Sequence, residues 1–404
     1  MTAFAEPTIM TLAQNPIASG TLPSLCTGTN AHIARIESAR LESLRPRHAG
    51  SNARLGEHGL LVRVPLVRIT DSDGASGFGV ARLTKEQAET WINAPLSGLF
   101  DKNTDAVSTE ALPLEFPLYD WAGKRAQKPV YALWDDTNAS SLEVPCYDTS
   151  LYFDDLHITD DIEATALITN EARDGYERGH RAFKIKVGRG ARHMELEKGT
   201  RRDIAIIRAV REAVGADCPL MIDANNGYNL NLTKRVLEET ADCRLFWLEE
   251  AFHEDPVLYR DLKEWMQTRG INTKIAEGEG EASPSLQAWA FRDGLIDVLQ
   301  YDVFWPGFTF WLELGQRLVE HPAVSAAPHH YGMHLGNYVT GHLARRVPRL
   351  LFLEWDEAQT PALDGSAYHV HEGRVTLPST PGFGLHLDEA LWNAAVRENG
   401  FIVG

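Results

Sequence analysis

Short apolar runs alternate with longer polar stretches of helical periodicity from about residue 143 to residue 356. The apolar runs predict eight β-strands, namely 144–152, 183–188, 219–225, 245–251, 273–279, 295–302, 324–330 and 350–356. The intervening segments, such as 162–179 and 257–270, space their apolar residues by three and four and end at glycine, as amphipathic helices do.

This alternation favours a parallel sheet with right-handed crossovers, and eight repeats favour closure of that sheet into a barrel. An open, doubly wound sheet also fits the pattern, but it is expected to carry a glycine-rich phosphate turn after its first strand. No G-x-G-x-x-G motif stands there. We therefore expect an α/β protein with a modified TIM-like (β/α)₈ barrel over residues 143–356.

The segments outside the barrel predict a second domain. Two β-like runs and later helical patterns over residues 33–142 indicate an α+β capping domain. Residues 357–404 have no further barrel strand to pair with and are expected to return to the cap. Residues 1–32 are rich in Ser, Thr, Pro and Ala without periodicity, which is typical of a loosely ordered extension.

Charge restricts the partners. Of 404 residues, 39 are Lys or Arg and 56 are Asp or Glu, so the net charge at pH 7 is −17. A chain of this sign repels phosphate backbones and anionic membrane surfaces. We expect neither nucleic acid nor membrane as a partner, and an anionic ligand would need a local positive site.

The cysteines indicate the compartment. Cys26, Cys146, Cys218 and Cys243 lack CxxC spacing, so neither a zinc knuckle nor a disulfide framework is indicated and a reducing cytoplasm is expected. No apolar run reaches the roughly 18 residues that span a bilayer.

Seven successive strands place a polar or ionisable group at or near their C-terminal ends, which is where barrel enzymes carry their chemistry. A single such residue is commonly a helix cap or a surface charge, but seven in succession are poorly explained in that way. In strand order they are Lys184 and Lys186, Asp223 with Asn225, Glu249, Glu277, Asp302, His329 and Glu354.

Three of these carboxylates predict a metal site. Asp223, Glu249 and Glu277 follow consecutive strands, so they are expected to converge above the barrel. An all-oxygen ligand set favours Mg²⁺, and Mn²⁺ would fit similarly. Glu250 is expected to point to the opposite side of its strand.

The remaining groups predict proton transfer. Lys184 and Lys186 are two residues apart and are expected to face the barrel interior together. Two buried ammonium groups beside a cation lower each other's pKa, which would make one of them a base at neutral pH; a salt-bridged pair is the alternative. Asp302 is expected to hold Nδ1 of His329 on the adjacent strand as an acid/base pair, with His330 facing away.

Together with their motifs, these residues resemble the enolase superfamily, specifically its mandelate racemase-like subgroup. The motifs are the FKIK lysine pair, DAN at 223–225, WLEEAFHEDP at 247–256, KIAEGE at 274–279 and DVLQYD at 297–302. The resemblance runs from about residue 33 to the C-terminus and implies a Mg²⁺-dependent enzyme that removes the proton α to a carboxylate.

The resemblance further implies a lyase that dehydrates an aldonate or aldarate to a 2-keto-3-deoxy acid, working as a homo-oligomer. Lys186 and His329 would act from opposite faces of the substrate. Protonation of the same carbon would instead give a racemase or epimerase of an α-hydroxy acid, and a non-catalytic barrel is a third possibility. The substrate contacts implied by the resemblance are Lys184, Asn225 and Glu354.

Two segments depart from the family's usual pattern and bear on the substrate. The loop 45–59 carries Arg47 and Arg54 among Gly, Ser and Asn, which is typical of a mobile lid, although a solvated surface loop has the same composition. The segment 303–311 replaces a glycine-rich turn and is expected to bring Trp305 to the rim of the site. We expect Arg47, Arg54 and Trp305 to contact the substrate.

Overall fold

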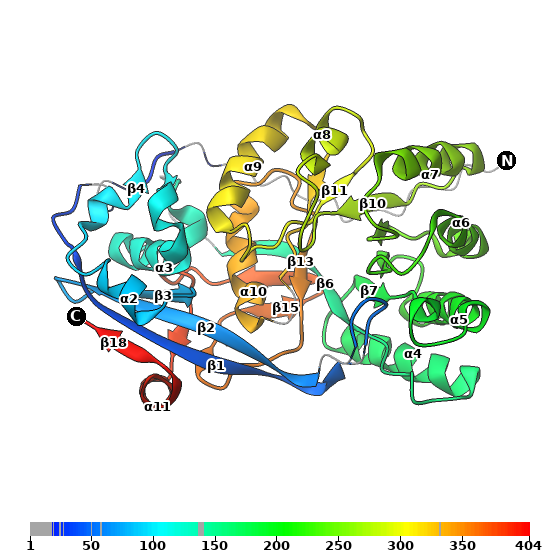
Figure 1. The fold of residues 1–404 in the computed structure, drawn as a ribbon, viewed down its shortest axis with the longest axis horizontal. Helices are drawn as coiled ribbons and strands as arrows, with labels where there is room; N and C mark the ends of the chain where they lie inside the picture. The colour runs from blue at the N-terminus through cyan, green and yellow to red at the C-terminus, as the bar shows by residue number, and fades with distance from the viewer. Residues whose placement is uncertain are drawn as a thin grey trace.

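The fold consists of a barrel and a capping domain that lies against one side of it (Figure 1). The computed structural model describes residues 18, 20–23, 26, 28–49, 51–56, 59–135, 141–330 and 333–404, with the backbone alone for 46–49. In these residues no helix is both long and apolar enough to cross a membrane.

The barrel has eight parallel strands, as predicted, and this excludes the open doubly wound sheet. In order they are β6 (Leu142–Leu151), β7 (Phe183–Lys186), β8 (Leu220–Asp223), β9 (Trp247–Glu249), β10 (Lys274–Glu277), β11 (Val298–Leu299), β12 (Ser325–Ala326) and β13 (Leu353–Trp355). Each strand pairs with the next, from β6 to β12. β13 pairs with β6, and a parallel bridge between Ala326 and Leu350 closes the ring.

Helices follow the first seven strands and cover the outside of the barrel (Figure 1). They are α4 (Asp161–Glu177), α5 (Leu196–Val214), α6 (Leu230–Glu239), α7 (Pro256–Arg269), α8 (Leu286–Phe291), α9 (Phe308–Glu320) and α10 (His334–Val339). Local sequence sets their ends. α7 begins after Asp255, whose carboxylate caps two backbone N–H groups, and ends at Gly270 in the left-handed region. The next α-helix after β13, α11 (Glu389–Asn399), packs on the cap instead.

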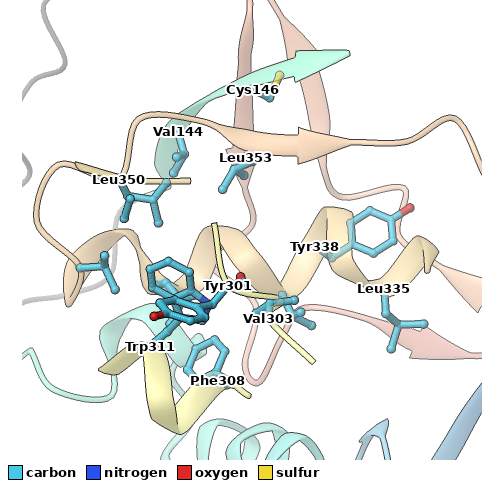
Figure 2. Close-up of a cluster of buried hydrophobic side chains, with 14 of the residues drawn as sticks. Val144, Cys146, Tyr301, Val303, Phe308, Trp311, Leu335, Tyr338, Leu350 and Leu353 are labelled. Carbon is cyan, nitrogen blue, oxygen red and sulfur yellow. The ribbon is translucent and has the colours of Figure 1, made fainter. Parts of the chain in front are cut away.

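Two apolar layers hold the barrel together. Its interior is filled by a cluster that includes Tyr147, Met221, Trp247 and Ala276. A larger cluster lies between the strands and the helices, and Figure 2 shows part of it, with Val144 of β6, Leu353 of β13 and Trp311 of α9. Because parallel strands are buried on both faces, they appear in the sequence as continuous apolar runs.

The capping sheet is antiparallel, with the strand order β18-β1-β2-β3. Its strands are β1 (Ile33–Ala49), β2 (Gly59–Asp71), β3 (Ser76–Val80) and β18 (Phe401–Val403). α3 (Glu115–Ala126) packs on β3, and α11 packs on β1. The short elements α2 (Lys85–Glu89), β4 (Phe100–Asp101) and β5 (Ala106–Val107) complete the N-terminal part.

The C-terminal segment contacts both domains. β15 (His369–His371) and β16 (Arg374–Leu377) extend the barrel sheet beside β6. β14 (Leu363–Asp364) pairs with β17 (His386–Leu387), and the chain then returns to the cap, where Val403 pairs with Ile36. The C-terminus therefore lies beside β1 (Figure 1).

The segment expected to be a loop at 45–59 begins as a strand, because β1 continues to Ala49 and its partner β2 starts at Gly59. Residues 51–56 then dock on the barrel. Ser51 forms a bridge with Phe153 after β6, and the carbonyl of Asn52 lies 2.8 Å from His193 Nε2. Residues 51–56 therefore lie against the barrel, and their role as a lid stays a prediction.

A buried carboxylate joins the two domains. Glu115, at the start of α3, accepts hydrogen bonds from the backbone N–H groups of Phe308 and Thr309 at 3.1 and 2.8 Å. These are the first residues of α9, so the cap supplies the N-terminal acceptor of a barrel helix. Burial raises the pKa of Glu115 to about 7, and the two N–H groups oppose that rise.

His342, at another junction of the two domains, predicts acid sensitivity. Its Nδ1 accepts from the N–H of Tyr131 at 3.1 Å, and its Nε2 lies 2.8 Å from the hydroxyl of Tyr368. Burial lowers the pKa of His342 to about 3. A histidine whose pKa is depressed on folding stabilises the fold above its unfolded pKa of about 6.5, and this contribution is lost as the pH falls toward 3.

We expect the thermal unfolding midpoint of the protein to be lower at pH 5 than at pH 7. In His342→Gln the difference between the two midpoints should be smaller than in wild type. Each pH unit below about 6.5 costs about 1.4 kcal/mol for one such group. The exposed His157 provides the control, because His157→Gln should keep the wild-type pH dependence. Calorimetry at both pH values decides the matter, and an equal fall in the His342 variant would contradict the assignment.

Candidate active site

The lysine pair on β7 faces the barrel interior. Lys184 and Lys186 are 0 % and 3 % exposed, and Ile185 between them packs in the outer apolar cluster. In the register of the sheet, Lys186 stands opposite Asp223 on β8, and Asp223 stands opposite Glu249 on β9. Strand alternation therefore brings both lysines and two carboxylates to one side of the sheet.

Three carboxylates gather at this position, and they are Asp223, Glu249 and Glu279. One oxygen of each lies within 4.8 Å of the others. Asp223 and Glu249 are buried, and the side chain of Glu279 is 13 % exposed. Glu279 was not among the residues selected from the sequence.

The structure corrects the prediction of Glu277 as a metal ligand. Ala276 packs in the barrel interior, so its neighbour Glu277 points outward, where it accepts a hydrogen bond of 2.6 Å from the hydroxyl of Tyr259 on α7. Gly278 has φ +124°, and after this turn the chain brings Glu279 to the other two carboxylates. Glu250 was left out of the candidate ligands because strand alternation directs it away from the barrel interior. The same argument, applied to β10, would also have excluded Glu277.

The lysines pair with the same carboxylates. Lys186 Nζ donates to Asp223, and Lys184 Nζ lies 2.6 Å from Glu249 Oε1. Burial would lower the pKa of Lys186, but Asp223 outweighs both burial and the repulsion from Lys184, so the pKa is raised. The salt-bridged alternative is the arrangement observed, and the mutual lowering of the two lysine pKa values, which was expected beside a bound cation, stays a prediction.

Glu249 is held by two further donors that sequence reasoning missed. Nε1 of Trp247 and Nε2 of Gln300 donate to Glu249 Oε2 at 3.0 and 2.9 Å. Burial raises the pKa of Glu249 to about 7, and Lys184 opposes the rise. Gln300 lies two residues before Asp302 in the same motif. Strand alternation places both residues on the same side of the strand, so Gln300 could have been selected together with Asp302.

The Asp302 and His329 side chains meet as predicted, with Oδ1 and Nδ1 2.6 Å apart. The other oxygen of Asp302 accepts from the N–H of Gly280 at 3.0 Å. Nε2 of His329 faces Glu279 at 3.4 Å and Glu354 at 3.7 Å. Burial would lower the pKa of His329, but Glu279, Glu354 and Asp302 raise it to about 10.

Glu354, at the end of the eighth strand, faces both Lys184 and His329. Its Oε1 is 3.4 Å from Lys184 Nζ and accepts from Thr149 at 2.7 Å, and its Oε2 accepts from the N–H of His330. Burial opposes ionisation, but His329 and Lys184 hold the pKa of Glu354 well below its usual range. Thr149 on β6 is, like Glu279, Trp247 and Gln300, a residue that was not selected from the sequence.

Asn225 lies beside the cluster. Its backbone N–H donates to Asp223 Oδ1 at 2.8 Å, and its Nδ2 donates to Glu250 at 2.9 Å. Its own Oδ1 is buried and accepts no hydrogen bond from the described residues. Burial, followed by Glu279 and Asp223, raises the pKa of Glu250 to about 8.

Three residues of the lid and rim, Arg47, Arg54 and Trp305, were predicted to contact the substrate. The Arg54 side chain is exposed, and the side chain of Arg47 lies outside the described residues. Arg45 is buried and pairs with Asp356, two residues after Glu354, at 3.1 Å. Trp305 is 76 % exposed, and its expected contact with the substrate at the rim stays a prediction.

The residues present fit a hard divalent cation. All three ligands offer carboxylate oxygens, which Mg²⁺ and Mn²⁺ prefer. Oε2 of Glu279 is buried and accepts no hydrogen bond from the described chain. Four carboxylates, Asp223, Glu249, Glu279 and Glu354, face two lysines and the imidazole of His329, so the carboxylates outnumber the cationic groups even when His329 is protonated.

Known proteins resemble this chain over most of its length. The family described as enolase C-terminal domain-like matches residues 168–391. A solved structure of galacturonate dehydratase from Geobacillus sp., complexed with D-galacturonate and 5-keto-4-deoxy-D-galacturonate, is 49% identical, covers 93% of this chain and 99% of its own, and has a TM-score of 0.89. A variant of that enzyme complexed with Mg is 48% identical, covers 95% and 100%, and has a TM-score of 0.91.

A more distant relative is D-galactarolactone cycloisomerase of Agrobacterium fabrum, which is 27% identical over 78% of this chain and 80% of its own. The family match spans more than half of the chain, and the closely similar structures span nearly all of it. This protein therefore belongs to the enolase superfamily, in its mandelate racemase-like branch.

Proposed function

We propose that this protein is a Mg²⁺-dependent sugar-acid dehydratase whose substrate is a hexuronate, with D-galacturonate as the first candidate. The observation that carries the proposal is the placement of Lys186 and the Asp302–His329 pair around one carboxylate cluster. The similarity to galacturonate dehydratase selects the substrate class within that chemistry. A uronate keeps an aldehyde at C1 and is neither an aldonate nor an aldarate, so this proposal changes the substrate class expected from the sequence, while the reaction stays the same.

Asp223, Glu249 and Glu279 hold the cation in this proposal. Bound Mg²⁺ supplies electrostatic stabilisation of the negative charge that gathers on the substrate carboxylate when the α-proton leaves. Trp247 and Gln300 keep Glu249 in place, because both donate to the same oxygen of its carboxylate.

Lys186 and His329 handle the protons. They come from the second and seventh strands, with the carboxylate cluster and Glu354 between them. One takes the proton from the α-carbon, and the other gives a proton to the departing β-hydroxyl, which leaves as water. Asp302 orients the imidazole of His329, while Lys184, Glu354 and Asn225 contact the substrate carboxylate or the enolate.

The product of this elimination is an enol that becomes a keto acid. In D-galacturonate the α-carbon is C5 and the β-hydroxyl is on C4, so the product is a 5-keto-4-deoxy acid. Counted from the carboxylate, this is the same 2-keto-3-deoxy group expected from the sequence. No redox partner is needed, because one C–H bond and one C–O bond break and water is released.

The proposal is tested by incubating the protein and Mg²⁺ with D-galacturonate, D-glucuronate, D-galactonate and galactarate, and measuring keto acid. We expect keto acid from D-galacturonate, with the C4 epimer D-glucuronate as the stereochemical control. The reaction is repeated in D₂O, because His329 and Lys186 could also protonate the same carbon. Deuterium at the α-carbon of recovered acid without keto acid would establish an epimerase and contradict dehydration.

Two further features belong to the proposal. We place the protein in the cytoplasm, which the four free, buried cysteines support. We also expect a homo-oligomer, as the family resemblance implies, and this can be measured by light scattering.

A further inference from the structure

We propose that Arg189 is a positioning residue that fixes the backbone beneath Lys186, an inference that rests on the proposed function because it takes Lys186 as a proton-transfer group. Arg189 follows β7 by three residues, and its side chain is fully buried. Its Nη1 donates to the carbonyl oxygen of Lys186 at 3.2 Å. The guanidinium thus contacts the end of the strand that carries the lysine.

Two buried aspartates hold this guanidinium in one orientation. Asp155, after β6, accepts from Nε and Nη2 of Arg189 at 3.0 and 2.6 Å. Asp203, on α5, accepts from Nη1 at 2.8 Å. Both carboxylates are 0 % exposed, so the arginine is clamped between the first barrel strand and the second barrel helix.

Asp203 also holds the backbone of the same turn. Its Oδ2 accepts from the N–H groups of Gly188 and Arg189 at 2.8 and 3.2 Å and from the hydroxyl of Tyr228 at 3.0 Å. The residues that immediately follow Lys186 are therefore fixed through their main chain as well as through the arginine side chain.

The same cluster supports the docked lid. The ring of Phe153 lies 4.3 Å from Arg189 Cζ, and the N–H of Phe153 donates to the carbonyl of Ser51 at 3.1 Å. Gly188 faces Ala53 so closely that an added Cβ would lie 2.8 Å from Ala53 Cβ. Arg189 therefore contacts both the segment behind Lys186 and the segment on which residues 51–56 rest.

Stability alone is a weak reason for this arrangement, because buried ion pairs are often no better than apolar residues of the same volume. A fully hydrogen-bonded network does select a single geometry. Geometry matters at a proton-transfer group, where a displacement of about 1 Å can cost about 100-fold in rate. The network is thus suited to hold Lys186 at a fixed distance from the substrate.

The test is Arg189→Lys, which keeps the charge but cannot bind Asp155, Asp203 and the Lys186 carbonyl together. We expect kcat to fall about 10- to 100-fold, while KM and the Mg²⁺ dissociation constant from calorimetry stay within about twofold. Tyr228→Phe, which removes one hydrogen bond to Asp203, should show a smaller loss. Arg235→Lys is the control, because Arg235 pairs with Glu197 and Glu239 on the surface.

Hydrogen exchange of the protein without substrate gives a second readout. In Arg189→Lys the amides of Gly188 and Phe153 should exchange faster than in wild type and Arg235→Lys. A kcat within about twofold of wild type, or unchanged exchange at both amides, would overturn the inference. Failure of the proposed function looks different, since the wild-type protein would then form no keto acid while the exchange result would stand.

Discussion

Lys186→Met should lower kcat by about 1000-fold or more, because general acid–base groups contribute about 10²- to 10⁴-fold and no other lysine in the described site can replace it. Lys184 is held by Glu249 and Glu354. Mg²⁺ affinity should be kept or improved, since the change releases Asp223 from its ion pair with Lys186. Keto-acid formation and titration calorimetry measure the two quantities.

Lys274→Met is the matched control for this substitution. Lys274 is the first residue of β10, at the other end of the barrel, and its ammonium lies 5.4 Å from the centre of the Phe246 ring. Its loss should leave turnover unchanged. Retained activity in Lys186→Met, measured on folded protein, would remove Lys186 from the mechanism.

Glu279→Gln and Glu277→Gln should have opposite outcomes although the two glutamates are two residues apart. Loss of the Glu279 carboxylate removes one of three ligands. Substitution of a residue that only hydrogen-bonds to a metal ligand weakens metal binding by up to about 100-fold, so loss of a ligand itself is expected to weaken Mg²⁺ binding by at least that much. Keto-acid formation should fall with it. Glu277→Gln should leave both within a few-fold, because the amide oxygen of the introduced side chain can still accept a hydrogen bond from the hydroxyl of Tyr259.

Each variant controls for the other, since both replace one carboxylate of the same short segment by an amide. Calorimetric titration with Mg²⁺ and the keto-acid assay are run on both. If Glu277→Gln weakened Mg²⁺ binding and Glu279→Gln did not, Glu277 would be the third metal ligand, as expected from the sequence.

Most of the barrel could be predicted because its strands are buried on both faces and are separated by amphipathic helices. The capping hairpin was harder, because Arg45, Pro46 and Arg47 have the composition of a loop. β1 nevertheless runs through them, since β2 supplies a partner for the first part of the hairpin and Asp356 neutralises Arg45. Such long-range pairing leaves no local pattern.

The site was predictable where strand alternation and motif spacing coincide, as for Lys184, Lys186, Asp223 and Glu249. It was not predictable at the end of β10, where the turn at Gly278 decides which glutamate enters the site. The exposure of Trp305 and the buried contacts of Thr149 depend on packing between elements. The spacing of residues along the sequence therefore predicts neither the exposure of Trp305 nor the contacts of Thr149.

The pairing of β18 with β1 has a consequence for synthesis of the protein. Ile36 is made long before its partner Val403, so one edge of β1 stays open while the whole barrel emerges from the ribosome. Unpaired strand edges are templates for association with other chains. The barrel can therefore begin to form during translation, but this edge of β1 is paired only after residues 401–403 of β18 have been made.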